Sequence, residues 1–431
     1  MLLADFRRAT GFTVFPALFA TGAFEIFSRG MPWRGEWAWS LEEVVGSTIL
    51  IAMLVAGATA FDVARSRGQA TRLLLGSTPR GPWAMTRTIL ANSWWGFAAV
   101  MVLAILVLTM TATTGAQGSI PVWVLLGVAA HLLGSSALGA LIGRFLPALI
   151  AAPVAAVLPW LLYGISISFE LPPLFQWVSP SAVMAGKTRS WDYMVWIILG
   201  MLGLTAFIAA AIALRDSPVR KFGVAAVAII GFASLVTSII RVSDPDFARI
   251  VVIGQPVEFV CEGHHPEVCL PATNVRKSAW LAREVQKAAD VLESHGVSIP
   301  ERFTMIVPGQ EVASGSGVFS FSPEDVNSPQ GPEGVGAEVL SQPADCPEYY
   351  ADNAPLGFAF EAQARIAMWI RLQLGQTSLQ ELRSGEESRW VYSAEDSEWF
   401  ATATGSSQVD WVARTYEQLT RCDLQSIKLS E

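Results

Sequence analysis

The sequence has 431 residues, of which 52% are hydrophobic and only 15% are charged, and its mean hydropathy is +0.42. Soluble globular domains carry about 25% charged residues, so this composition excludes an ordinary soluble protein and indicates a membrane protein. With a net charge of −8, we expect no nucleic-acid partner.

The charge is distributed unevenly along the chain. Residues 1–240 contain 15 Lys and Arg against 9 Asp and Glu, a balance of +6, whereas residues 241–431 contain 14 against 28, a balance of −14. The chain thus divides near Arg241 into a basic, apolar half and an acidic, polar half. We therefore predict a transmembrane domain over 1–240 and a second domain over 241–431.

The first half contains seven apolar segments of the length that a membrane-spanning helix needs, roughly 20 residues. Lipid offers no hydrogen-bond partner to an open backbone, so each segment must be a helix. The predicted spans are 10–28, 43–63, 88–110, 121–143, 146–168, 193–213 and 222–240.

The basic residues determine the predicted orientation. With the N-terminus in the cytoplasm, the cytoplasmic segments hold eleven Lys and Arg, and the outer loops of the first half hold four. Basic residues concentrate on the cytoplasmic side of membrane proteins, so we expect this orientation rather than the reverse. Seven spans then place the second half outside the cytoplasm. We expect a multi-pass protein of the cell membrane, embedded in the lipid bilayer.

The first outer loop is rich in tryptophan. The stretch RGMPWRGEWAWSLEE, residues 29–43, alternates Trp with charge. An indole ring is apolar but its N–H prefers water, and tryptophans therefore gather at membrane interfaces. We expect this stretch to lie along the outer membrane surface.

A short basic segment joins the second predicted span to the third. It reads ARSRGQATRLLLGSTPRGPW, residues 64–83, and is cytoplasmic in the predicted orientation. RGQATRLLL can form two helical turns with an arginine on one side and leucines on the other, and GSTPRGPW then ends the helix. A loop that only sets topology needs the arginines but not the leucines.

This segment, with its arginines, its leucine run and its TPRGPW ending, resembles the coupling helix of ABC transporter permeases of the ABC-2 type. The resemblance extends over about residues 1–215. It implies six core spans per subunit, two paired subunits, and an ATPase that contacts the 66–80 helix. The seventh span and the second domain depart from this plan and look like extracytoplasmic extensions fused to some such permeases. The residues that the resemblance assigns to ATPase coupling are Arg65, Arg67, Arg72, Leu73, Leu74, Leu75 and Arg80.

The chain shows no ATP-binding motif of its own. Gly186, Lys187 and Thr188 read like the end of a phosphate-binding loop, but Ser181 stands where that loop needs its first glycine. The predicted topology also places them outside the cytoplasm. We therefore expect no cofactor in this chain, and ATP and Mg²⁺ on a partner ATPase.

Polar residues inside the predicted spans are candidates for a substrate pathway. A carboxylate in a bilayer is costly and usually faces a partner or a water-filled cavity. Glu25 lies near the outer end of the first span, where it either lines a substrate pathway or reaches the membrane surface. His131 lies in the middle of the fourth span, where a hydrogen bond to a neighbouring helix is favoured over a proton relay. Asp62 is expected to pair with Arg65 or Arg67, or to cap its helix.

All four cysteines, Cys261, Cys269, Cys346 and Cys422, lie in the second half. This distribution favours an oxidised extracytoplasmic domain with two disulfides over four free thiols in a cytosolic domain. We predict the pairs Cys261–Cys269 and Cys346–Cys422. A zinc site could use His264 and His265, but adjacent histidines in a short loop rarely face one ion. We therefore expect no metal.

The second half is predicted to be an α-rich α+β domain. Its helices are expected at about 276–294, 359–374 and 408–421, and FTMIVPG and GFAFE are candidate strands. The 359–374 helix holds Glu361 without the two histidines of a zinc peptidase, and no hydrolase signature is evident. The predicted fold is an α-helical polytopic membrane protein with about seven transmembrane helices and this smaller domain.

The expected function is that of a transmembrane permease subunit of an ABC-type exporter, which is not itself an enzyme. Its expected partners are a cytosolic ABC ATPase and a second permease copy or a homologous permease. Two other classes remain open. One is a membrane-anchored receptor or accessory subunit whose outer domain binds a ligand, and the other is a membrane-tethered enzyme.

Overall fold

The computed structural model describes residues 9–28, 30–66, 84–116, 118–168, 184, 186–216, 221–244, 250–252, 257–307, 310–320, 334–346, 356–377 and 405–429. The chain separates into two compact units, Met1–Val251 and Val252–Glu431. The charge pattern placed the corresponding boundary at residue 240. We call these parts the N-terminal unit and the C-terminal unit.

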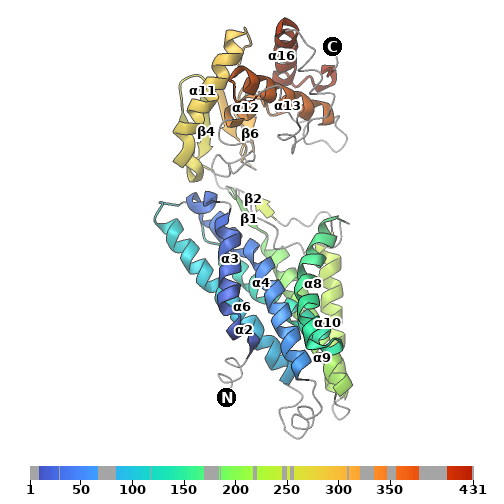
Figure 1. Cartoon of the computed structure of the whole chain (residues 1–431). Helices are drawn as coiled ribbons and strands as arrows, with labels where there is room; N and C mark the ends of the chain where they lie inside the picture. The colour runs from blue at the N-terminus through green and yellow to red at the C-terminus, as the bar shows by residue number, and fades with distance from the viewer. Residues whose placement is uncertain are drawn as a thin grey trace. The chain divides into compact units, whose positions relative to one another are not determined.

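The N-terminal unit is a bundle of helices that run side by side (Figure 1). Six of its described helices are long and apolar enough to cross a membrane, which indicates a membrane protein. These six are α4 (Trp37–Arg65), α6 (Ala84–Ala112), α7 (Val124–Phe145), α8 (Ala148–Ser168), α9 (Trp191–Asp216) and α10 (Lys221–Val242).

The first predicted span, 10–28, forms two helices rather than one. The four-residue α2 (Thr10–Thr13) is followed by α3 (Phe15–Ser28), with a break at Val14. Pro16 explains the break, because it has no N–H to donate to the carbonyl of Phe12. With 14 residues, α3 is shorter than a bilayer crossing requires. The described residues therefore contain six long apolar helices, where the sequence analysis expected seven spans.

The tryptophan-rich stretch, which was expected to lie along the surface, is buried in part. Pro32–Gly35 form the short 3-10 helix η1, and α4 begins at Trp37, six residues before the predicted span. Trp33 is fully buried and Trp39 is 1% exposed, because both rings pack into the core of the bundle. Trp33 and Trp39 thus contribute to the interior of the bundle.

The central helix of the bundle is α4, which packs against α3, α6, α7 and α8 (Figure 1). Its contact with α7 depends on small residues. A Cβ atom at Gly139 would lie 2.2 Å from the carbonyl oxygen of Ala56, and one at Gly143 would lie 2.4 Å from that of Ala60. Both pairs are four residues apart along their helices. This is the spacing that lets membrane helices bring their backbones together.

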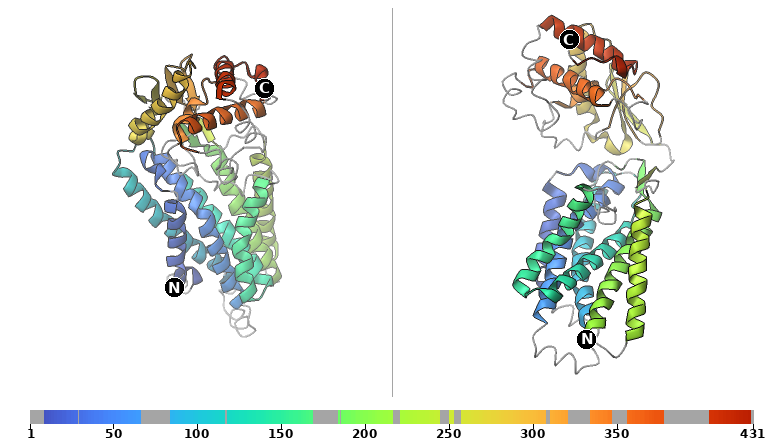
Figure 2. Two further views of the ribbon diagram at one scale, coloured as in Figure 1. Left: turned by 45° about the horizontal axis from the view of Figure 1, so that its top comes forward. Right: turned by 90° about the vertical axis from the view of Figure 1, so that its right-hand side faces the viewer.

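The last two helices of the bundle form a close pair at its edge. α10 packs on α9 (Figure 2), and a Cβ at either Gly203 or Gly231 would lie 2.7 Å from the carbonyl oxygen of the other glycine. The outward faces of α8 and α10 are apolar and exposed; Leu149 on α8 is 87% exposed and Ile230 on α10 is 68% exposed. Lipid or another membrane subunit must cover these faces.

The described chain also forms a small two-stranded sheet beside α9 and α10 in sequence. The strands β1 (Lys187–Arg189), immediately before α9, and β2 (Ile250–Val252), after α10, pair in a two-stranded sheet. The first two residues of β2 end the N-terminal unit.

The C-terminal unit contains a four-stranded sheet with helices around it. Its strand order is β3-β4-β5-β6; β3 runs antiparallel to β4, and the other pairs are parallel. The strands are β3 (Phe259–Glu262), β4 (Glu267–Pro271), β5 (Arg302–Met305) and β6 (Gly317–Phe319). The helices are η5 (Ala272–Lys277), α11 (Ser278–Ser294), α12 (Val335–Leu340), α13 (Leu356–Gln373), α16 (Gly405–Thr420) and η8 (Leu424–Ser426).

The connection from β4 to β5 is a crossover through η5 and α11. Apolar residues of α11 recur every three or four positions, so that Leu281, Val285 and Leu292 are all buried. The three predicted helices of this half appear as α11, α13 and α16. FTMIVPG overlaps β5, as predicted. GFAFE, residues 357–361, lies in α13, so its prediction as a strand was wrong: its apolar residues belong to a helical pattern that continues to residue 373.

The C-terminal unit contains two disulfides, and they join the predicted pairs of cysteines. Cys261 and Cys269 lie directly opposite each other on β3 and β4. Cys346, which follows α12, is bonded to Cys422 in the turn after α16. The two disulfides indicate that this unit lies in an oxidising, extracytoplasmic compartment.

The α4–α7 contact gives the first testable prediction. Replacing Gly139 with Ala places a methyl group against the Ala56 carbonyl and should destabilise the protein by about 1–3 kcal/mol. Gly164 in α8 is a matched control, because a Cβ there meets nothing within 4 Å. Thermal unfolding in detergent measures both variants. Equal effects of Gly139→Ala and Gly164→Ala would contradict the close α4–α7 approach.

The disulfides give the second prediction. They close loops with sequence separations of 8 and 76 residues. Chain entropy then assigns about 2.5 kcal/mol to Cys261–Cys269 and about 4.5 kcal/mol to Cys346–Cys422. Removing the second pair by Cys346→Ala with Cys422→Ala should therefore cost more stability than removing the first pair. Denaturant unfolding compares the variants, and mass spectrometry of unreduced protein checks the pairing; free thiols would refute it.

Candidate functional site

The predicted coupling segment lies mostly outside the described residues. Arg65 is the last residue of α4, and its guanidinium lies 5.3 Å from the centre of the Phe61 ring. Ser66 follows, and α6 begins at Ala84. The other predicted coupling residues fall in the part of the chain that the structure does not describe; they are Arg67, Arg72, Leu73, Leu74, Leu75 and Arg80.

The two candidate pathway residues belong to different parts of the bundle. Glu25 is half-buried near the end of α3, three residues before Ser28. His131 is buried in α7. α3 packs mainly on α4 and α6, whereas α7 packs on α4, α6, α8 and α9. Both helices pack on α4 and α6 but make no extensive contact with each other, so the described residues do not bring Glu25 and His131 together.

A buried charge pair of the described N-terminal unit was not predicted. Arg189, at the end of β1, donates from Nε to Oε1 of Glu42 at 2.7 Å and from Nη2 to Oε2 at 2.6 Å. Both side chains are less than 10% exposed. Burial alone would lower the pKa of Arg189, but the Glu42 carboxylate outweighs this effect and raises it. This two-pronged ion pair ties β1 to the second turn of α4.

A second buried carboxyl lies six residues before Glu42. Glu36 immediately precedes α4, is 3% exposed, and accepts a hydrogen bond of 3.2 Å from the backbone N–H of Met184. Burial raises the pKa of Glu36 to about 8, against the opposing effects of the Met184 N–H and of Lys187. Glu36 and Glu42 thus both bind the chain that leads through β1 into α9.

Hydroxyl and indole groups complete this region. Ser40 on α4 lies 2.7 Å from the hydroxyl of Thr111 on α6 and donates to the carbonyl oxygen of Trp33 or of Glu36. The Trp39 indole N–H donates to Glu43 at 3.1 Å. We call the side chains of Glu36, Ser40, Glu42, Thr111 and Arg189 the polar clamp. All five are buried, and they join α4, α6 and β1.

A smaller polar junction lies at the other end of α4. Asp62 accepts hydrogen bonds from the backbone N–H and the hydroxyl of Thr10, and from the amide of Asn92 at 3.1 Å. Asn92 in turn accepts from the backbone N–H of Gly11 at 2.7 Å. Asp62 thus caps the first turn of α2, where the sequence analysis expected an arginine partner or a cap on its own helix.

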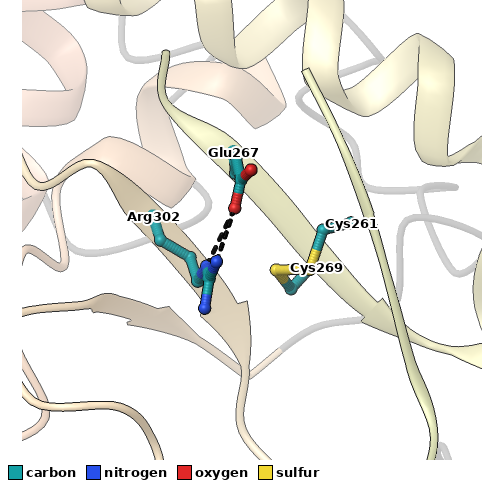
Figure 3. The surroundings of a disulfide bond; sticks show 4 residues. All are labelled: Cys261, Glu267, Cys269 and Arg302. Carbon is teal, nitrogen blue, oxygen red and sulfur yellow. Dashed lines mark hydrogen bonds and ion pairs between the residues drawn. A yellow bond between two sulfur atoms is a disulfide. The ribbon is translucent and has the colours of Figure 1, made fainter. Parts of the chain in front are cut away.

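The C-terminal unit places three potential metal ligands together, but two of them are committed elsewhere. Cys261, Glu267 and Cys269 have ligand atoms within 4.8 Å of one another. The two sulfur atoms form a disulfide, so neither is available as a thiolate. Glu267 is held by Arg302 across the parallel pair of β4 and β5, at 2.7 Å (Figure 3). This arrangement is structural.

The histidines around this disulfide are exposed. His265 pairs with Glu293 of α11 at 2.9 Å, and His264 is exposed beside it. Glu361, the carboxylate of the helix considered for a zinc peptidase, accepts a hydrogen bond from Arg365 at 3.0 Å. Arg365 also donates to the carbonyl oxygen of Leu429, which ties the end of the chain to α13.

Few features of the sequence indicate the polar clamp. Glu42 and Arg189 are 147 positions apart, and no local periodicity joins such residues. The available signal was two acidic residues at the start of an apolar span, since a charge near lipid requires a partner. Arg189, a basic residue in a predicted outer loop, was a residue of opposite charge that this signal could have suggested as the partner.

Comparison with known proteins gives one finding for the C-terminal unit. Residues 268–422 match a family of domains described as a domain of unknown function, DUF7224. The matched range includes the Cys346–Cys422 disulfide and no part of the N-terminal unit. No curated protein and no solved structure matches the chain.

The ion pair of the polar clamp gives the third prediction. Glu42→Gln leaves the Arg189 guanidinium buried beside a neutral partner, which should cost about 3–5 kcal/mol and lower the unfolding midpoint by roughly 10 °C. Glu43→Gln is the matched control, because an amide oxygen can still accept from Trp39. Thermal unfolding in detergent compares the two. Combining Glu42→Leu with Arg189→Met should recover much of the loss; equal stability of both single variants would disprove the role of the pair.

Proposed function

We propose that the chain is the transmembrane permease subunit of an ABC-type exporter, driven by a separate cytosolic ATPase. The observation that carries this proposal is the basic, leucine-bearing segment 64–83, which resembles the coupling helix of ABC-2 permeases. Support comes from its position in the fold. It connects the end of α4 to the start of α6, and these two long apolar helices pack against each other. A partner that grips the segment would therefore act on two adjacent helices at once.

The proposal includes seven crossings with a cytoplasmic N-terminus. In this arrangement α2 and α3 together make the first crossing, and the six long helices make the others. The excess of Lys and Arg on one side supports this orientation. The two disulfides support an extracytoplasmic C-terminal unit, which requires an odd number of crossings after a cytoplasmic N-terminus.

The partners follow from the same proposal. ATP and Mg²⁺ would bind to the ATPase, and two permease subunits would enclose the transport pathway. The exposed apolar faces of α8 and α10 are compatible with a second subunit in the membrane. The acidic C-terminal halves, at −14 each, would repel each other, so we expect the subunits to pair through their helices.

The coupling segment gives the fourth prediction. Leu74→Asp should abolish co-purification with the ATPase, because burying an unpaired carboxylate costs several kcal/mol and about 3 kcal/mol already lowers affinity roughly a hundredfold. Membrane insertion should be unchanged, since no apolar helix is altered. The measurements are co-purification with the candidate ATPase and ATP hydrolysis in membranes.

Two control variants separate charge from shape. Gln69→Asp adds the same charge to the same segment, and Leu74→Met keeps an apolar side chain of similar volume; both should retain the ATPase. If Leu74→Asp also retains its partner and stimulated hydrolysis, the coupling role is wrong. A ligand-binding receptor subunit, or a membrane-tethered enzyme, would then be the better account.

A further inference from the structure

We propose that the outward face of α11 docks the C-terminal unit on an anionic lipid surface. We call this surface the basic face; its residues are Arg276, Lys277, Trp280, Arg283 and Lys287. The inference does not rest on the exporter proposal, because it uses only the surface charge of the C-terminal unit and the membrane attachment of the chain.

The basic face lies opposite the buried side of α11. Leu281 and Val285 are buried, and the helix packs on β4 and α12 (Figure 1). At about 100° per residue, Trp280, Arg283 and Lys287 fall within a sector of about 60° on the other side of the helix. Arg283 and Lys287 are exposed, and Trp280 is half-buried. The folding of α11 onto the sheet therefore turns these three residues outward.

Two further basic residues extend this face at the start of the helix. Arg276 and Lys277 are both exposed and belong to η5, directly before α11 begins at Ser278. The ammonium of Lys277 lies 5.9 Å from the centre of a ring of Trp280. The basic face thus combines four positive charges with one indole.

This positive charge is exceptional in its unit. Residues 252–431 hold 12 Lys and Arg against 26 Asp and Glu, a balance of −14, whereas residues 276–287 hold four against one, a balance of +3. The one acid is Glu284, which pairs with Lys287 at 2.8 Å. Asp290, one turn further along the same side of α11, ends the basic face. A cluster of four basic residues on an amphipathic helix is typical of segments that bind anionic lipids.

The stability of α11 does not explain these charges. A helix N-terminus carries a partial positive charge, so Arg276 and Lys277 are unfavourable there, and the first turn has no acidic residue to offset them. Arg283 and Lys287 are four positions apart, a spacing at which like charges also destabilise a helix. The positive charge opposes local stability, which indicates that it serves a partner outside the unit.

Two observations favour lipid over an acidic protein as that partner. Trp280 lies among the basic residues, and an indole ring is suited to the boundary between headgroups and acyl chains. The C-terminal unit begins at Val252, ten residues after α10 ends at Val242, and ten extended residues span at most about 35 Å. This short covalent connection to an apolar helix gives the unit a high effective concentration at the bilayer surface.

Acetylation of lysines in the full chain, measured by mass spectrometry, tests the inference. Lys277 and Lys287 report on the basic face, and Lys428 is an exposed lysine elsewhere in the same unit. The chain is compared in nanodiscs of phosphatidylcholine and in nanodiscs that also contain phosphatidylglycerol. At about fivefold for each basic residue, a net charge of three strengthens association with an anionic surface about a hundredfold.

The expected result is selective protection in the anionic nanodiscs. With phosphatidylglycerol, acetylation of Lys277 and Lys287 should slow about tenfold or more, while that of Lys428 is unchanged. High salt should remove the protection, because the Debye length falls to about 3 Å at 1 M. This salt effect on the wild type decides the question without any substitution.

Paired charge reversals give a matched control. Arg276→Glu with Arg283→Glu changes the balance of residues 276–287 from +3 to −1 and should abolish the protection of the two reporter lysines. Arg414→Glu with Arg421→Glu makes the same change in charge, also at positions seven residues apart, in and directly after α16. This second pair should retain the protection. Thermal unfolding checks that both variants are folded.

Four outcomes would overturn the inference. The first is equal acetylation of Lys277 and Lys287 in both kinds of nanodisc, and the second is protection that survives the reversal of Arg276 and Arg283. Protection that is already present in phosphatidylcholine, or that grows with the number of chains per disc, would mean that protein covers the basic face. Protection by inorganic phosphate in phosphatidylcholine nanodiscs would mean a site for a free anion instead of a lipid surface.

Discussion

Hydrocarbon offers no hydrogen-bond partners, and this constraint organises the whole N-terminal unit. Every polar group that the bundle carries into its interior needs another part of the chain as its partner. The central helix α4 shows the result at both ends. Near its start Glu42 binds Arg189, and near its end Asp62 binds Thr10 and Asn92. The apolar length between these two junctions is free to pack closely against four neighbouring helices.

The two units are held together by different kinds of packing. In lipid, apolar side chains gain little by leaving the solvent, so helices associate through close backbone contact, as α4 and α7 do at Gly139 and Gly143. The C-terminal unit buries large apolar side chains instead, among them Phe303 and Phe319 of its sheet and Trp369 of α13. Its two disulfides add covalent restraint to this small core.

Sequence periodicity and composition predicted the structural features that depend on local pattern, such as the long helices. Five of the predicted spans coincide with long helices to within four residues at either end, and α4 extends six residues before its predicted start because the segment from Trp37 continues the helix. The cysteine pairs followed from spacing and compartment. Residues 29–43 were misassigned because tryptophans and carboxylates read as surface residues when considered alone. Glu42 is buried against Arg189, and Trp33 and Trp39 are buried in the core of the bundle. No local pattern links a residue to a partner 147 positions away.

The length of α4 has a mechanical consequence. At 1.5 Å per residue its 29 residues extend about 43 Å, whereas the hydrocarbon core of a bilayer is about 30 Å thick. The continuous helix α4 therefore extends beyond the apolar layer at one or both faces. A helix resists compression along its axis, because its hydrogen bonds run in that direction. A force applied at Arg65 would therefore be transmitted along the helix to Trp37, because no hinge lies between them.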